Sequence, residues 1–154
     1  MLGKKKQLYK EGDWFAVPLR EGGYAVGLIV RSGGVLFGYF FGPKREKIPG
    51  LSEFQALTPE NAIFVGQFGD LGLLKGKWPI IGHSESWDRR IWPMLPLVRR
   101  DAVSGEARLI KYSDDDPIQE ISETPCDLFE IRNYPEDGLW GSGAVEIRLT
   151  KLLS

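Results

Sequence analysis

The segment from Ile80 to Met94 (IIGHSESWDRRIWPM) concentrates the residue types that could perform chemistry. It contains the only histidine of the chain, His83, followed by serines and acidic residues, and these are the residue types of a nucleophilic triad. Adjacent residues of an extended chain point to opposite faces, so the side chains of His83 and Ser84 should diverge. Neither serine lies in the Gly-x-Ser-x-Gly turn that presents the nucleophile in many hydrolases. The segment therefore predicts a surface or hydrogen-bonded histidine rather than a catalytic one.

The sequence offers no ligand set for a metal or a cofactor. A structural zinc site needs about four Cys or His ligands, whereas this chain has only His83 and Cys126. The acidic run from Asp114 to Asp116 lacks the alternating ligands and the central glycine of an EF-hand. The glycine-rich pieces GGYAVG and GSGAVE match neither a phosphate loop nor a dinucleotide fingerprint. We therefore expect no cofactor.

Tryptophan and arginine are interleaved from Trp87 to Arg100, which is a pattern typical of protein interfaces. The residues concerned are Trp87, Arg89, Arg90, Trp92, Arg99 and Arg100. The same pattern occurs in nucleic-acid-binding β-barrels, but the net charge of -1 and the pI near 5.9 do not favour that class. Trp14 and Trp78 should fill the core, while Trp87 and Trp92 are candidates for an exposed interaction surface.

Charge is unevenly distributed along the chain. Residues 75–111 contain eight Lys or Arg and four Asp or Glu, whereas residues 113–137 contain nine Asp or Glu and a single Arg132. Such segregation creates local fields that attract oppositely charged partners, and its alternative is a solvated face without a partner.

The elements that position these residues are predicted to be mostly β-strands. β-Branched and aromatic runs separated by glycine-rich turns predict strands at residues 13–19, 24–31, 35–41, 62–68, 78–81, 107–112 and 144–149. Gly42-Pro43 should end the third strand, and Gly27 and Gly38 inside strands suggest bulges or bends. Thr58-Pro59 favours one helical turn, and a helix is possible only within about 118–131, where Pro125 interrupts it.

This pattern predicts a mainly β fold, either a small coiled antiparallel sheet or an SH3-like, partly open barrel, with irregular loops and at most one or two short helices. We expect one domain over residues 1–154, with residues 1–8 as a flexible basic tail. No apolar run reaches the roughly 20 residues that span a bilayer. The lone cysteine and the lack of a signal-like apolar segment at the N-terminus predict a cytoplasmic protein.

Four segments in order resemble the immunity protein 26 family of bacterial polymorphic toxin systems. They are EGDWFAVPLREGGYAVGLIVR, GYFFGPK, FGDLGLLKGKWPIIG and WDRRIWPM, which lie between about Tyr9 and Met94, and the acidic stretch from Tyr112 to Pro117 extends the match. The resemblance implies a non-enzymatic cytoplasmic antidote that binds a cognate toxin domain. A basic, nuclease-like domain is a candidate for this toxin. The resemblance implies neither a membrane nor a nucleic acid as partner.

The candidate toxin-binding residues combine the acidic segment with the Trp/Arg pattern. They are Asp114, Asp115, Asp116, Glu120, Glu123, Asp127, Trp87, Arg89 and Trp92. In this interpretation the carboxylates steer a basic toxin and the tryptophans and the arginine anchor it. Two other classes stay open: a nucleic-acid-binding β-barrel that uses the region from Arg89 to Arg100, and a hydrolase that uses His83.

Overall fold

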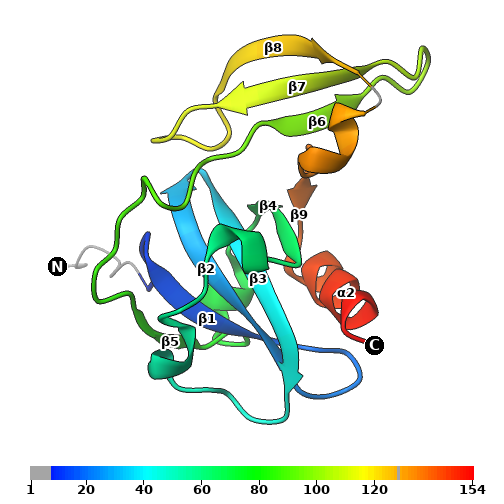
Figure 1. Cartoon of the computed structure of the whole chain (residues 1–154). Coiled ribbons are helices and arrows are strands. Elements are labelled where there is room, and N and C mark those ends of the chain that lie inside the picture. The colour runs from blue at the N-terminus through cyan, green and yellow to red at the C-terminus, as the bar shows by residue number, and fades with distance from the viewer. Residues whose placement is uncertain (1–7, 128) are drawn as a thin grey trace, which may run out of the picture.

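Two β-sheets form the framework of the chain, and the computed structural model describes residues 8–127 and 129–154 (Figure 1). The larger sheet has six strands in the order β5-β1-β2-β3-β4-β9, and the smaller has three in the order β6-β7-β8. All pairings are antiparallel except that of β4 with β9. The strands are β1 (Asp13–Pro18), β2 (Tyr24–Gly33), β3 (Val35–Arg45), β4 (Phe64–Phe68), β5 (Ile80–His83), β6 (Leu97–Arg100), β7 (Ala107–Tyr112), β8 (Glu120–Cys126) and β9 (Leu139–Trp140).

The predicted mainly β class with few helices is confirmed, and within the described residues the sheets do not close into a barrel. The described α-helices are α1 (Leu71–Leu74) and α2 (Ser142–Leu152), and the 3-10 turns are η1 (Leu51–Phe54), η2 (Pro59–Asn61) and η3 (Glu130–Asn133). The predicted turn after Thr58 is η2, closed by a reciprocal capping box between Thr58 and Asn61. No helix among the residues described is long and apolar enough to cross a membrane.

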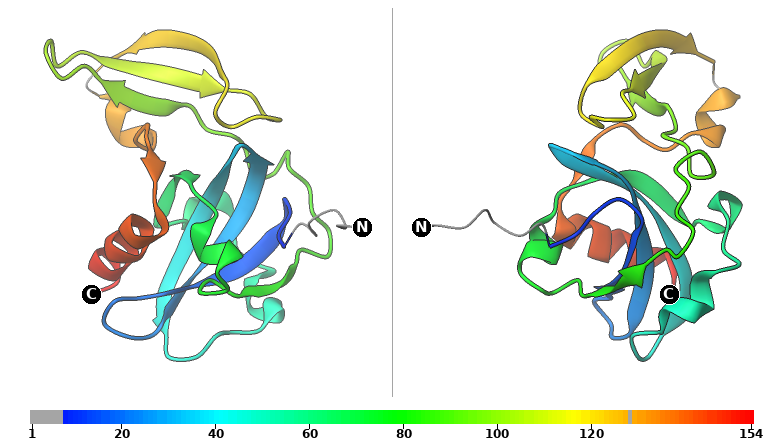
Figure 2. Two further views of the ribbon diagram at one scale, coloured as in Figure 1. Left: turned by 180° about the vertical axis from the view of Figure 1, so that it is seen from behind. Right: turned by 90° about the vertical axis from the view of Figure 1, so that its left-hand side faces the viewer.

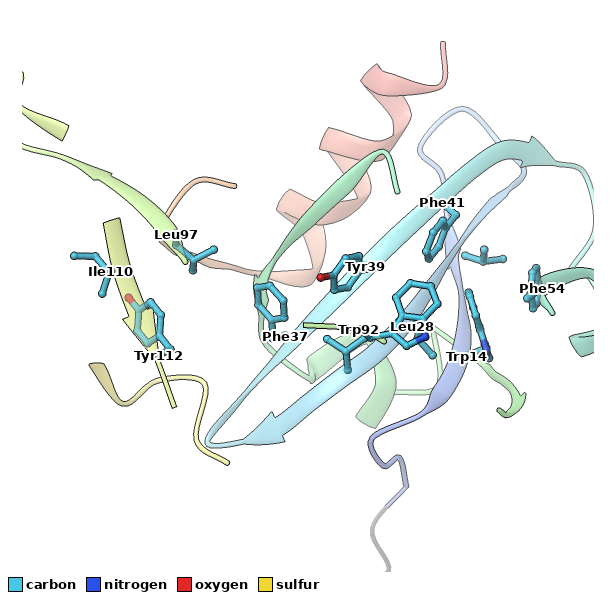
Figure 3. Close-up of a cluster of buried hydrophobic side chains, with 12 residues drawn as sticks. Trp14, Leu28, Phe37, Tyr39, Phe41, Phe54, Trp92, Leu97, Ile110 and Tyr112 are labelled. Carbon is cyan, nitrogen blue, oxygen red and sulfur yellow. The ribbon is translucent and has the colours of Figure 1, made fainter. Parts of the chain in front are cut away.

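The larger sheet is covered on both faces, which explains why its central strands are almost continuously apolar. Along β2, Val26, Leu28 and Val30 enter one core, while Ala25 and Ile29 enter the other, as the two-residue period of a strand requires. α2 and Trp78 close the second core. The first core lies between the sheet and the segments that follow it in the chain, including η1 and the small sheet (Figure 3).

Gly27 and Gly38 make room for aromatic rings. A Cβ atom on Gly27 would lie 2.4 Å from the Phe15 ring, and one on Gly38 would lie 2.7 Å from the Phe68 ring. The predicted bulge does occur, but its extra residue is Val30, opposite the step from Phe37 to Gly38. Both glycines therefore serve close packing across the sheet.

Two predictions about the C-terminal third were wrong. The predicted strand at 144–149 is part of α2, because Val145 and Leu149 are buried four residues apart while Ile147 between them is 52% exposed. The possible helix at 118–131 is instead β8 followed by η3. Pro125 is compatible with β8 because this strand is the edge of its sheet.

The third strand also continues further than expected, because β3 passes through a cis Gly42-Pro43 peptide and ends at Arg45. Strands β6 and β9 were not predicted, since each is short and lies in a loop-like sequence.

The small sheet stands beyond the end of the large sheet where β2 turns into β3 (Figures 1 and 2). Leu97, Ile110 and Tyr112 from β6 and β7 join the core that contains Phe37 (Figure 3). By contrast, every residue of β8 from Glu120 to Pro125 is exposed, so β8 adds no side chain to either core. The small sheet is therefore attached through β6 and β7 and presents β8 outward.

Candidate functional site

His83 and Ser84 have separate partners. The His83 Nδ1 atom lies 2.9 Å from a carboxylate oxygen of Asp13, which is only 6% exposed. The Ser84 hydroxyl accepts a hydrogen bond of 3.0 Å from the Trp14 indole. Their side chains thus diverge, as the alternation along a strand predicts, and the described contacts include no hydrogen bond between them. The geometry assigns His83 to pairing β5 with β1.

Trp92 is a core residue. It is 7% exposed, and its ring lies edge-on to Trp14, Tyr39 and Phe41 at centroid distances of 6.2, 5.3 and 5.9 Å (Figure 3). The expectation that this indole is available to a partner does not match its position, because the ring packs in the core against residues of β2 and β3. Its burial leaves Trp92 out of the candidate surface.

Trp87 and Arg89 share one carboxylate, that of Glu11. The Trp87 indole N–H donates to Glu11 at 2.9 Å, and the Arg89 guanidinium donates to both Glu11 oxygens at 3.1 and 2.7 Å. The hydrogen bonds from Arg89 to Glu11 raise the pKa of Arg89 above its usual value. Both residues remain partly exposed, so they can border a surface, but their polar groups are already bound.

Two of the three consecutive aspartates hold framework arginines. Asp114 accepts a hydrogen bond of 2.9 Å from Arg31, whose side chain is 4% exposed, and Asp115 accepts one of 3.0 Å from Arg89. Asp116 accepts only from the backbone N–H of Ile118, at 3.2 Å. Asp114 and Asp115 therefore fix the turn before β8, and Asp116 is the one without an arginine partner among the described residues.

Carboxylates along β8 pair with the basic strands beside it. Glu120 lies 2.8 Å from Arg99, and Glu123 lies 3.4 Å from Arg108. Both carboxylates stay about half exposed, at 49% and 46%. Asp127 accepts from the backbone N–H groups of Phe129 and Glu130 in the following turn. The basic and acidic segments of the sequence thus neutralise each other across the small sheet.

A polar cluster joins β6 and β7 to the segment before β9. Arg99 donates to Asp137 at 2.8 Å, and the Tyr112 hydroxyl donates to the same carboxylate. Burial, together with the hydrogen bond to Asp137, raises the pKa of Tyr112 to about 12. Hydrogen bonding to Asp137 also raises the pKa of Arg99. These contacts connect β6, β7 and the segment before β9 at the junction of the small sheet.

A groove of about 820 Å³ runs between the two sheets. Its walls include aromatic rings of Phe64 and Trp140, and its charged lining residues are Arg100, Arg132, Arg148, Glu136 and Asp137. Charges of both signs therefore face this groove. Over residues 8–127 and 129–154, no three His, Cys, Asp or Glu residues gather in a way that could hold a metal ion.

The acidic candidates from Asp114 to Asp127 all lie on or beside the small sheet, and this sheet also exposes apolar side chains that sequence reasoning missed. Ile118, Ile121 and Phe129 are 57%, 58% and 81% exposed. Sequence reasoning also missed the role of Arg31, which appeared only as the charged end of a predicted strand. Its hydrogen-bond partners Asp114, Trp92 and Arg89 lie 58 to 83 residues away in the sequence, so no local pattern indicates them. The signal for Ile121 was its place in an alternating Ile-Ser-Glu-Thr stretch that reads equally well as a helix.

Comparison with known proteins gives one match. The family model described as Immunity protein 26 matches residues 10–109, which is about two thirds of the chain. No curated protein and no solved structure shows a significant match. The matched residues include β1 to β6 and the first part of β7, so they contain every strand of the larger sheet except β9. The chain therefore belongs to the immunity protein 26 family.

Proposed function

We propose that this protein binds a cognate bacterial toxin domain in the cytoplasm and blocks it by covering its active surface. The family match over residues 10–109 is the observation that carries this proposal. An inhibitor of this kind needs a stable scaffold and an exposed surface, and it needs no chemistry of its own. The continuous double core of the large sheet is suited to be that scaffold.

The contact surface in this proposal is the exposed edge strand β8 with the residues that flank it, which we call the β8 surface: Asp116, Glu120, Ile121, Glu123, Asp127 and Phe129. Its support is that β8 is exposed along its length and buries nothing in the core. Within the earlier set of candidates, Asp114 and Asp115 hold the β8 surface in place through Arg31 and Arg89. Trp87 and Arg89 border it through the same network.

Electrostatics favour a basic toxin, such as one that acts on nucleic acid. The segment from Ile118 to Ile131 contains four acidic residues and neither Lys nor Arg. Pairing with Arg99 and Arg108 leaves Glu120 and Glu123 about half exposed, so each can accept a further cation. Exposed charges at the rim of an interface mainly raise the association rate and its dependence on salt.

Binding kinetics with the purified toxin domain encoded by the adjacent gene test this function. The double variant Asp116→Asn and Asp127→Asn keeps both side-chain acceptors but removes two charges, and we expect association to slow several-fold at low salt. The matched control, Glu21→Gln with Glu46→Gln, removes two exposed charges from the loop between β1 and β2 and from the segment after β3, outside the small sheet, and should bind at the wild-type rate. Failure of the wild-type protein to bind would refute the function, and equal rates for both double variants would remove the acidic steering.

A further inference from the structure

Strand β8 leaves one edge of the small sheet without a partner in the described part of the chain. The opposite edge is covered, since the Val98 N–H donates to Pro135 and the Val98 carbonyl accepts from Asp137, both at 2.8 Å. Among the described strands, β8 pairs only with β7. An open edge strand is a template for pairing with another chain, and proteins normally shorten or cover such edges.

The direction of the backbone groups on β8 follows from two independent observations. The N–H and carbonyl of Val98 point away from β7, so Leu97 and Arg99 supply the hydrogen bonds from β6 to β7. Because Leu97 pairs with Ile110, the N–H and carbonyl of Ile110 point toward β6. Because Ile110 faces β6, its partner on the other side, Glu123, must point its own N–H and carbonyl away from β7.

Pro125 gives the same result. Proline has no N–H, so Arg108 and Pro125 form a pair that is not hydrogen-bonded, and the alternation along the strand assigns Glu123 to the same outward set. Among the described residues, no turn or loop hydrogen bond involves the Glu123 N–H or carbonyl. Thr124 and Ser122 carry the bonds to β7 instead.

The side chains of this edge define the partner strand. Glu123 is 46% exposed, and Ile121, the extra residue where the register of β8 shifts against β7, is 58% exposed. An added strand that carries a cationic and an apolar side chain would meet these two residues. A second copy of this chain fits less well, because its β8 would bring another acidic segment against this one.

We propose that the outer edge of β8 receives an extended basic segment of the toxin as a fourth strand of the small sheet. This inference rests on the proposed function and specifies how the toxin is recognised. Main-chain hydrogen bonds to Glu123 provide the pairing, and the acidic and apolar side chains of the edge select the segment. Pro125 limits the pairing at one end, since it offers a carbonyl but no donor.

A proline substitution at Glu123 tests the edge directly. Glu123→Pro removes the outward N–H without removing a bond to β7, and the matched control Glu123→Ala removes the same carboxylate but keeps the N–H. We expect Glu123→Pro to bind the toxin domain of the adjacent gene about tenfold more weakly than Glu123→Ala. Both variants should unfold within a few degrees of each other, because neither loses a ladder hydrogen bond.

Amide hydrogen exchange of the wild-type protein gives a second readout. The outward amide of Glu123 should exchange rapidly in the free protein and slowly in the complex. If the proline and alanine variants bind equally, or if this amide is not protected in a stable complex, the edge pairing is overturned while toxin binding stands. If the wild-type protein forms no complex, the proposed function fails and the edge pairing fails with it.

Discussion

Arg31, on β2, connects the large sheet to the turn between β7 and β8. Its guanidinium is 4% exposed and contacts the Asp114 carboxylate and the main-chain carbonyls of Val30, Arg89 and Trp92. A buried charge of this kind is stable only because each of its three nitrogens donates a hydrogen bond. Removing it leaves several carbonyls and one carboxylate without a partner at the same time.

We therefore predict that Arg31→Met lowers the free energy of unfolding by about 3–5 kcal/mol. The control is Arg90→Met, whose side chain is 88% exposed and pairs only with Asp88; its effect should stay within about 0.5 kcal/mol. Urea unfolding followed by tryptophan fluorescence measures both. Similar values for the two variants would show that the buried network contributes little.

Gly27 carries the second prediction at this scale, because a Cβ atom there would overlap the Phe15 ring. Gly27→Ala should destabilise the protein by about 1–3 kcal/mol, since the ring or the strand must shift. Gly50→Ala is the matched control, because no atom lies within 4 Å of the added Cβ and the backbone there is extended. Thermal unfolding should separate the two variants, and an unchanged midpoint for Gly27→Ala would contradict the close packing.

At the scale of elements, the sequence predicted the strands that consist of β-branched and aromatic runs and missed those whose position depends on partners. β1, β2 and β7 were located to within two residues, since their β-branched and aromatic runs have one interpretation. In α2, Val145, Ile147 and Leu149 alternate as in a strand, and only tertiary packing selects the helix. β8 has few apolar residues, so only its ladder with β7 makes it a strand.

The junction of the small sheet should be sensitive to alkaline pH. Burial raises the pKa of Tyr112 to about 12 from a usual value near 10. The folded state therefore retains this proton more strongly than the unfolded state, so the contribution to stability is complete below pH 10 and is lost as the pH rises toward 12. Tyr112→Phe should show a smaller loss of stability between pH 10 and 12 than the wild type. The free energy of unfolding is measured by urea titration at each pH. Equal losses for the wild type and Tyr112→Phe would contradict a role of the Tyr112 proton at this junction.

Over the whole molecule, charge that is segregated in the sequence becomes paired in the fold. Arginines of the basic segment bind carboxylates of the acidic segment in the small sheet, such as Arg99 with Glu120 and Arg108 with Glu123. Counting charges along the chain could locate the acidic surface but could not show these pairs, because they depend on strand register. The same limit explains Trp92, which follows the charged run from Asp88 to Arg90 in the sequence but packs against aromatic rings in the fold.

In the proposed mode of toxin binding, stability and recognition belong to different parts of the molecule. The family match covers most of the large sheet, while β8, which is outside the match, carries the most exposed strand of the described chain. Variants on β8 should thus change toxin binding with little effect on folding, whereas variants of Arg31 or Trp92 should affect both.

Growth rescue tests the central claim most directly. The toxin domain encoded by the adjacent gene is induced in cells that also produce the wild-type chain, the Glu123→Pro variant or the Glu123→Ala variant. We predict that the wild type restores growth and co-purifies with the toxin, and that Glu123→Pro rescues less well than Glu123→Ala at equal protein levels. Growth arrest despite abundant, folded wild-type protein and an active toxin would contradict the account.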